Sequence, residues 1–322
     1  MSRQTFHTIQ MRKVIYSKYG SIDDLKIVET GTPLFKENEL LIKVKAVAIN
    51  PLDWKIIEGD LKIITGSKFP KGIAFDFAGI VEKKGNLISQ YEIGDEVFGV
   101  LDAMKGEALA EYIIVSEQII YKKPTSISFE KAAAMATVGA TALNLFKHCN
   151  VKAGSKILIN GAGGSVGMIA LQIAKNKGLK ITAVASGKGL EFLKKWEPEN
   201  TIDYNIENIM QQNAFYDTIF ELSGKLSFKK ARSLMTPTSV YVSTLPFPAD
   251  IITSFFNNLW SSKKHRMIMG RPTQDNYREL CKLVSENNLE IIIVKTYSMA
   301  DFKEAYQFAK QGGIVGKIVF SL

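Results

Sequence analysis

A glycine-rich stretch between a strand and a helix constrains this chain more than any other feature. The stretch reads NGAGGSVGMIALQIAKNKG, residues 160–178, and the strand-like run KILIN leads directly into it. Apolar residues at helical spacing predict a helix that begins near Ser165 and stops at Gly178. A second strand, KITAVAS, follows. Strand, glycine loop, helix and strand in this order are typical of a parallel sheet that binds a dinucleotide.

The loop suits the phosphates of such a cofactor. Residues 162–167 read A-x-G-x-x-G, the dinucleotide fingerprint with alanine in the first glycine position. Gly163 and Gly164 would let the backbone approach a pyrophosphate, and the helix N-terminus offers free N–H groups. The predicted cofactor contacts here are Gly163, Gly164, Ser165 and Val166. An ordinary tight turn between strand and helix is the alternative interpretation.

The end of the second strand distinguishes NAD from NADP. NAD sites usually place an Asp or Glu there to bind the ribose 2′-hydroxyl. This chain has Ser186 and Lys188 instead, and no acid occurs before Glu191. A hydroxyl and an ammonium suit a 2′-phosphate, which a carboxylate would repel. Tyr204, after the third strand, would line the same phosphate or the adenine. We therefore predict NADPH as cofactor, with Lys188 as an ordinary solvated lysine as the alternative.

The pattern of predicted strands and helices changes near Pro124. Short β-rich runs such as ELLIKVKAVAIN precede it, whereas strands alternate with helices from about residue 127 to about residue 270. The closing run GKIVFSL has no helix after it and should pair with the N-terminal sheet. We predict an α/β protein in which a Rossmann-like, doubly wound parallel sheet domain (127–270) is inserted into a β-rich catalytic domain (1–126 plus 271–322).

Composition excludes several classes of protein and site. The chain of 322 residues is 46% hydrophobic and 23% charged, as a globular protein is, with no apolar run long enough to span a bilayer. The first ten residues lack the apolar core of a signal peptide, and Cys149 and Cys281 share no motif. We expect a cytoplasmic protein. His7, His148 and His265 provide no zinc-ligand spacing.

The net charge of +9 allows two interpretations, an anionic partner or a lysine-rich solvated surface. Only six of the 41 basic residues are arginine, which recognises phosphates and bases better than lysine does. The surface interpretation is therefore favoured, and a nucleic-acid partner is not expected.

Several further segments carry a family resemblance. They are AINPLDWK at 48–55, FDFAGIV at 75–81, GDEVFGV at 94–100, AEYIIV at 110–115, AAAMATVGATAL at 132–143 and GKIVF at 316–320. With the glycine loop they resemble the medium-chain dehydrogenase/reductase superfamily, in its zinc-free quinone oxidoreductase branch of zeta-crystallin-like and chloroplast-envelope quinone-oxidoreductase-like reductases. The resemblance implies an alcohol-dehydrogenase-like fold whose β-rich domain is GroES-like, and a homodimer. It also implies cofactor contacts from Thr137 and Lys317.

Departures from the zinc-dependent members bear on the chemistry. Those enzymes place a metal-binding Cys where this chain has Asn50, three residues before Asp53, and a Gly-His-Glu segment where it has residues 74–76. The resemblance thus implies a retained fold without a metal. A metal-free site cannot easily polarise a plain alcohol, but it suits substrates that are already electrophilic, such as quinones and α,β-unsaturated carbonyls.

The expected reaction is hydride transfer from NADPH to such an acceptor. Asn50 is the first candidate for a catalytic donor, and Lys55 is the second, as a cation that stabilises an oxyanion. A turn residue and a solvated lysine are the plainer alternatives. The competing function is a non-catalytic NADPH sensor or an RNA-binding, zeta-crystallin-like protein. We also expect 239–245 and 265–270 to be edge strands that pair in a dimer, and 61–68 and 247–260 to be loops that line the substrate pocket.

Overall fold

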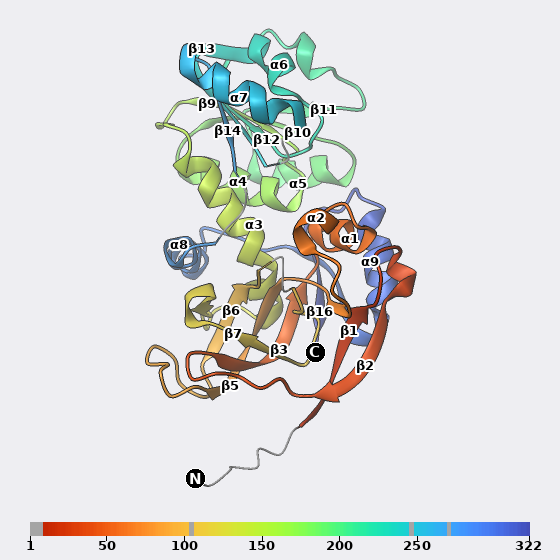
Figure 1. Ribbon diagram of the computed structural model, residues 1–322. Helices are drawn as coiled ribbons and strands as arrows, with labels where there is room; N and C mark the ends of the chain where they lie inside the picture. Colours follow the sequence, from red (N-terminus) through yellow and green to blue (C-terminus); the bar gives the residue numbers. More distant parts are fainter. Residues whose placement is uncertain (1–8, 103–105, 245–247, 269–271) are drawn as a thin grey trace. The chain divides into compact units, whose positions relative to one another are not determined.

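The computed structural model describes residues 9–102, 106–244, 248–268 and 272–322. The chain divides into two compact units, coloured along the sequence in Figure 1. The first unit comprises residues 1–136, 295–312 and 317–322, and the second comprises residues 137–294 and 313–316. Each unit is described by itself below. Among the described residues, no helix combines the length and the apolar character that crossing a bilayer requires.

A parallel sheet forms the centre of the second unit. In the described part of the chain it has six strands in the order β11-β10-β9-β12-β13-β14. Their bounds are β9 Lys156–Asn160, β10 Lys180–Ala185, β11 Asn200–Asp203, β12 Tyr216–Glu221, β13 Met235–Ser243 and β14 Lys264–Met267. The order runs outward in both directions from β9 and β12, so the sheet is doubly wound, as predicted.

Helices cover this sheet because each parallel connection needs a crossover. The helices are α3 Phe129–Lys147, α4 Ser165–Asn176, α5 Lys188–Trp196, α6 Phe228–Ala231, α7 Pro248–Trp260 and α8 Gln274–Ser285. The connections through α4 and α5 lie on one face of the sheet and those through α6 and α7 on the other (Figure 1). Ile157, Leu158 and Ile159 of β9 are fully buried between these layers.

The first unit is β-rich and mostly antiparallel. Its strands are β1 Gln10–Tyr16, β2 Lys26–Gly31, β3 Leu40–Ala48, β4 Lys71–Gly72, β5 Asp76–Lys84, β6 Glu96–Val100, β7 Tyr112–Val115, β8 Ile120–Lys122 and β16 Lys317–Ser321, with β15 Ile293–Ser298 at the boundary. Its helices are α1 Pro51–Glu58, α2 Lys62–Thr65 and α9 Phe302–Lys310. The C-terminal β16 pairs antiparallel with β3, as expected for GKIVFSL, and Val319 lies opposite Ala48.

Three local expectations were wrong. Residues 239–243 do not form an edge strand, because they belong to β13, which lies between β12 and β14. The described part of 265–270 includes the end of β14, which lies at one edge of the described sheet, while residues 245, 269 and 270 lie outside the described residues. Residues 248–260 of the expected loop 247–260 form helix α7, while Phe247 lies outside the described residues. Within 61–68, residues Lys62–Thr65 form the short helix α2. Strand order cannot be read from a list of strands, and aromatic residues hid the helical pattern of α7.

The contact-based units do not coincide with the predicted domain limits. Helix α3 is continuous across the division at residues 136 and 137, and residues 272–294 group with the second unit. Close packing explains the second grouping, because a Cβ on Gly139 of α3 would lie 2.7 Å from a methyl of Leu280 in α8. The division into 1–126 plus 271–322 and 127–270 therefore stays a prediction.

Candidate nucleotide and reduction site

The glycine loop joins β9 to α4 through a tight turn. Gly161 has φ +93°, a conformation that favours glycine, and Gly164 is the N-cap of α4. A Cβ on Gly167 would lie only 2.2 Å from the carbonyl oxygen of Gly161, so the helix start and the loop pack backbone to backbone. Gly163 has more room, since its Cβ would lie 3.1 Å from the Cα of Gly189. Gly167, the third glycine of the fingerprint, is therefore the one that close packing of the helix against the loop requires.

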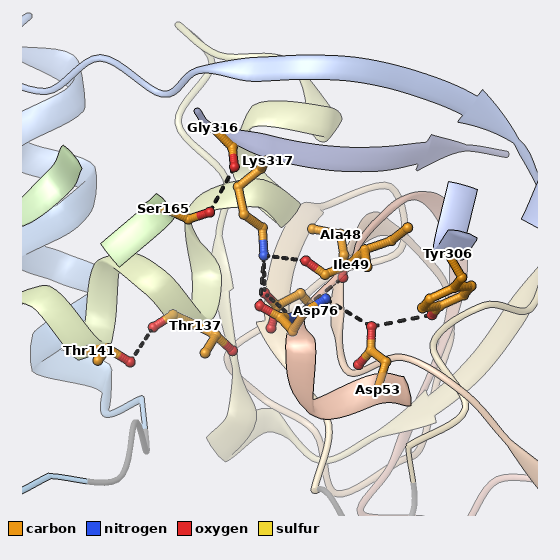
Figure 2. Close-up of polar contacts among 11 residues, drawn as sticks. Ala48, Ile49, Asp53, Asp76, Thr137, Thr141, Ser165, Tyr306, Gly316 and Lys317 are labelled. Carbon is orange, nitrogen blue, oxygen red and sulfur yellow. Dashed lines mark hydrogen bonds and ion pairs between the residues drawn. The ribbon is translucent and has the colours of Figure 1, made fainter. Parts of the chain in front are cut away.

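The start of α4 presents backbone N–H groups that lack partners within the helix. Ser165 and Val166 lie there, both half-buried. The Ser165 hydroxyl donates a hydrogen bond to the carbonyl of Gly316, 2.7 Å away (Figure 2). This bond ties the segment 313–316 to the glycine loop within the second unit. A helix N-terminus with adjoining glycines is a suitable binding site for a pyrophosphate.

The candidates for the 2′-phosphate gather beyond the end of β10. Ser186 directly follows the strand, and Lys188 is the exposed first residue of α5. The backbone N–H of Tyr204 donates to the carbonyl of Ala185 at 3.2 Å, which brings the end of β11 beside Ser186. The Tyr204 side chain is 53% exposed. Ser186, Lys188 and Tyr204, which the sequence suggested for one phosphate, therefore all follow the C-terminal ends of the neighbouring parallel strands β10 and β11.

A buried polar cluster lies in the first unit, where β16 meets β3. The ammonium of Lys317 donates to the backbone carbonyl of Ile49 and to the side-chain oxygen of Asn50, both at 2.7 Å (Figure 2). It also lies 3.7 Å from Oδ2 of Asp76. Asn50 donates its amide to the same Asp76 oxygen at 3.0 Å and faces the carbonyl of Ala48 at 3.5 Å. Lys317 is 5% exposed and Asp76 is fully buried.

A second carboxylate, Asp53, adjoins this cluster. Its Oδ2 accepts the backbone N–H of Asn50, the N-cap of α1, at 2.9 Å, and the Tyr306 hydroxyl at 3.2 Å (Figure 2). Its Oδ1 is buried and accepts no hydrogen bond from any described residue. Burial raises the pKa of Asp53 to about 7, and the charge of Asp76 acts in the same direction. Asp53 and Asp76 thus both accept a hydrogen bond from Asn50.

Burial also shifts the pKa values of Lys317 and Tyr306, the partners of these carboxylates. It lowers the pKa of the Lys317 ammonium, although the charges of Asp76 and Asp53 oppose that shift. Burial, together with the charge of Asp53, raises the pKa of Tyr306 well above its usual range. The Tyr306 hydroxyl therefore stays protonated and remains a donor to Asp53.

The remaining predicted site residues lie in different surroundings. Lys55 is exposed on α1, and its ammonium has no hydrogen-bond partner in the described part of the chain. Thr137 is half-buried on α3, and its carbonyl accepts the hydroxyl of Thr141 at 2.8 Å. Asn50 accepts from Lys317 and donates one amide hydrogen to Asp76, so only its second amide hydrogen, which faces the Ala48 carbonyl at 3.5 Å, is available to a ligand. These site assignments stay predictions.

Comparisons with known proteins agree with this architecture. Residues 36–125 match the alcohol dehydrogenase GroES-like domain family, and residues 198–320 match the zinc-binding dehydrogenase family. The chain is 29% identical to the chloroplastic quinone-oxidoreductase homolog of Spinacia oleracea, with 99% of each chain covered. Its fold matches the quinone oxidoreductase of Coxiella burnetii with a TM-score of 0.90 and 28% identity, covering 98% of this chain and 100% of that one.

The chain belongs to the medium-chain dehydrogenase/reductase superfamily, in its quinone oxidoreductase branch. It is therefore an oxidoreductase with a Rossmann domain and a GroES-like domain. A further relative is the chloroplastic NADPH-dependent alkenal/one oxidoreductase of Arabidopsis thaliana, which is 36% identical over 67% of this chain and 58% of that protein.

The residues of the Asn50 cluster do not fit a zinc ion. Protein zinc sites use Cys, His and carboxylate ligands. Here the cluster offers one amide and one carboxylate, and both face the resident ammonium of Lys317. In the described residues, no group of three or more His, Cys, Asp or Glu side chains is arranged to hold a metal.

Sequence reasoning missed a third buried carboxylate, that of Glu221, which lies next to the start of the glycine loop. Glu221, at the end of β12, accepts hydrogen bonds from the Asn160 amide at 2.6 Å and from the backbone N–H of Ser223 at 2.9 Å. It also accepts the backbone N–H of Lys225 at 3.2 Å. The available signal was an acid at the end of a buried strand followed by the turn residues Ser-Gly.

Proposed function

We propose that this protein is a zinc-independent, NADPH-dependent reductase that transfers a hydride to a quinone or an α,β-unsaturated carbonyl. The observation that carries the cofactor choice is the end of β10, where Ser186 and Lys188 stand in place of an acid and Tyr204 lies alongside. The names of the spinach and Arabidopsis relatives support the two substrate classes.

The glycine loop and the start of α4 would hold the pyrophosphate of the cofactor. Gly163, Ser165 and Val166 would offer backbone N–H groups there, with the positive end of the helix dipole behind them. The N–H of Gly164 donates to the Gly161 carbonyl, so Gly164 would contribute by its lack of a side chain, which lets the phosphates approach the backbone. The residues present thus fit a dinucleotide. Bound NADPH supplies the hydride. The protein's part is to bind the cofactor, orient it and exclude water.

The Asn50 cluster holds the buried ammonium of Lys317 against the side-chain oxygen of Asn50, and the Asp76 carboxylate lies beside both groups. Hydride addition to a conjugated acceptor leaves an electron pair on a carbonyl oxygen, and that oxygen then takes a proton. We propose that Asn50, polarised by Lys317, and the exposed ammonium of Lys55 stabilise this oxygen. Thr137 and Lys317 remain proposed cofactor contacts. Lys317 would contribute mainly through its charge, because two of its N–H groups donate to Ile49 and Asn50.

A turnover screen tests the activity. NADPH oxidation would be followed with a quinone and with an enone, and NADH would serve as the control cofactor. We expect turnover with NADPH and a clear preference for it over NADH. Lys188→Ala should weaken NADPH binding far more than NADH binding, and equal loss of both would show that Lys188 does not recognise the 2′-phosphate. NADPH binding without turnover of either acceptor class would favour the sensor function instead.

The metal-free chemistry needs its own measurement. Elemental analysis of the active enzyme should find no stoichiometric zinc, and chelators should leave turnover unchanged. Activity that falls with chelation and returns with zinc would contradict this part of the proposal.

A homodimer and a cytoplasmic location remain proposals. β14 is one of the two edge strands of the described six-stranded sheet, so its unpaired backbone groups would pair with a second copy across a two-fold axis. A monomeric mass in solution at micromolar concentration would count against the dimer. The spinach and Arabidopsis relatives are described as chloroplastic, so fractionation of the source cell is needed to test the compartment.

A further inference from the structure

Lys225 and Tyr204 meet although they follow different strands. The ammonium of Lys225, in the loop after β12, lies 5.2 Å from the ring centroid of Tyr204, which follows β11. Both side chains are exposed. The backbone N–H of Tyr204 donates a hydrogen bond to the carbonyl of Ala185, the last residue of β10. The pair therefore lies at the C-terminal end of β10, next to Ser186. A cation over an aromatic face keeps its charge and its donor hydrogens available to a ligand.

Hydrogen bonds to Glu221 and Ser223 hold the backbone of Lys225 in place. Its N–H donates to Oε1 of the fully buried Glu221 and to the Ser223 hydroxyl, at 3.2 and 3.1 Å. The intervening Gly224 has φ +70°, which favours glycine. The turn therefore fixes where the Lys225 side chain emerges. The Glu221 carboxylate does not compete for the ammonium, since Asn160, Ser223 and the Lys225 backbone already donate to it.

We infer that Lys225, positioned over Tyr204, is a further specificity-determining residue that binds the 2′-phosphate of NADPH together with Ser186 and Lys188. The inference rests on the proposed NADPH-dependent function and deepens it. A 2′-phosphate carries a charge close to −2, and one lysine neutralises only part of it. A second ammonium from another loop would add a charge-assisted bond that NADH cannot form. An isolated surface pair of Lys225 and Tyr204 would instead stabilise only the fold, and only slightly.

The test compares two fragments of the cofactor, 2′,5′-ADP and 5′-ADP, which differ only in the 2′-phosphate. Binding of 2′,5′-ADP and of 5′-ADP would be measured by calorimetry for the wild type and for Lys225→Met. We expect Lys225→Met to weaken 2′,5′-ADP binding about tenfold and to leave 5′-ADP binding within about twofold. The matched control is Lys180→Met, because Lys180 is exposed at the opposite end of β10. It should change neither affinity.

Variants of the tyrosine separate positioning from folding. Tyr204→Phe keeps the aromatic face and should retain the preference for 2′,5′-ADP, whereas Tyr204→Leu should reduce it with an unchanged unfolding midpoint. Added salt screens charges, so it should weaken the preference for 2′,5′-ADP over 5′-ADP more in the wild type than in Lys225→Met. The inference is overturned if Lys225→Met keeps the full preference, or if it weakens both fragments equally. A wild type with no preference at all would instead overturn the NADPH proposal itself.

Discussion

The ammonium of Lys317 lies 2.7 Å from the side-chain oxygen of Asn50, 267 positions away in the sequence. The contact exists because β16 returns to pair with β3, whose end carries the Asn50 segment. The cluster that results buries one ammonium with the carboxylate of Asp76, and the carboxyl group of Asp53 adjoins it. Its charge balance has consequences that can be measured without knowing the substrate.

Lys317→Met should destabilise the protein by about 3–5 kcal/mol, because it leaves Asp76 buried without its cation. Urea unfolding of the two proteins measures the difference. The control is Lys310→Met, a change in the same C-terminal segment as Lys317. It removes an exposed ion pair with Glu58 of α1 and should lower the free energy of unfolding by less than about 1 kcal/mol.

The double variant Lys317→Met with Asp76→Asn provides the second arm of this measurement. Removing both charges relieves the unpaired carboxylate, so the double variant should be more stable than the sum of the single losses implies. Strict additivity would mean that the two groups do not interact.

Asp53→Asn should become more stable relative to the wild type as the pH rises from about 4 to about 7. The pKa of Asp53 is about 7 in the folded protein and about 4 in an unfolded chain. Between these values the unfolded state has released a proton that the folded state still holds, so wild-type stability falls as the pH rises, by up to about 1.4 kcal/mol per pH unit. Asparagine has no such titration.

Urea unfolding of both proteins at several pH values between about 4 and about 8 gives the difference directly. Titrating groups that do not interact with Asp53 cancel in the comparison. A difference that stays flat over this range would show that the Asp53 pKa is not raised.

Gly167→Ala should disrupt the nucleotide loop, whereas Gly164→Ala should not. A Cβ at Gly167 would lie 2.2 Å from the backbone oxygen of Gly161, so either the loop or the helix must move, at a cost of about 1–3 kcal/mol. At Gly164 the nearest atom would be 3.4 Å away and φ is −80°, so folding should be unaffected.

Thermal unfolding and NADPH titration distinguish these two effects. Gly167→Ala should lose stability and affinity together, and Gly164→Ala should lose affinity alone, because its methyl would stand where the pyrophosphate approaches. Full affinity in Gly164→Ala would place the phosphates elsewhere on the loop.

The sequence predicted the strand, glycine loop and helix around Ser165, because each step has a local signal. It also predicted that β16 pairs with the N-terminal sheet. The helix α1 was not predicted, because Asn50 followed by Pro51 is typical both of a turn and of a helix N-cap with proline in the first turn. Local patterns do not distinguish these two structures.

The candidate site was predicted unevenly for a similar reason. Ser186, Lys188 and Tyr204 could be chosen because each follows a recognisable strand. The partners of Lys317 could not, because they depend on which strands pair across the chain. Lys225 was missed because its contact with Tyr204 depends on the order β11-β10-β9-β12, which no single segment encodes.

Ser165→Ala should lower the stability of the protein, whereas Ser186→Ala should change its cofactor preference. The Ser165 hydroxyl donates to the Gly316 carbonyl at 2.7 Å, so its loss should cost about 1 kcal/mol of unfolding free energy. The Ser186 hydroxyl has no hydrogen-bond partner among the described residues, so Ser186→Ala should leave stability unchanged. It should nevertheless weaken NADPH binding more than NADH binding, because the hydroxyl is proposed to bind the 2′-phosphate. Urea unfolding and cofactor titration on the same two variants provide both measurements. Equal stability losses would contradict the assigned contacts, and an unchanged NADPH preference in Ser186→Ala would remove that residue from the phosphate site.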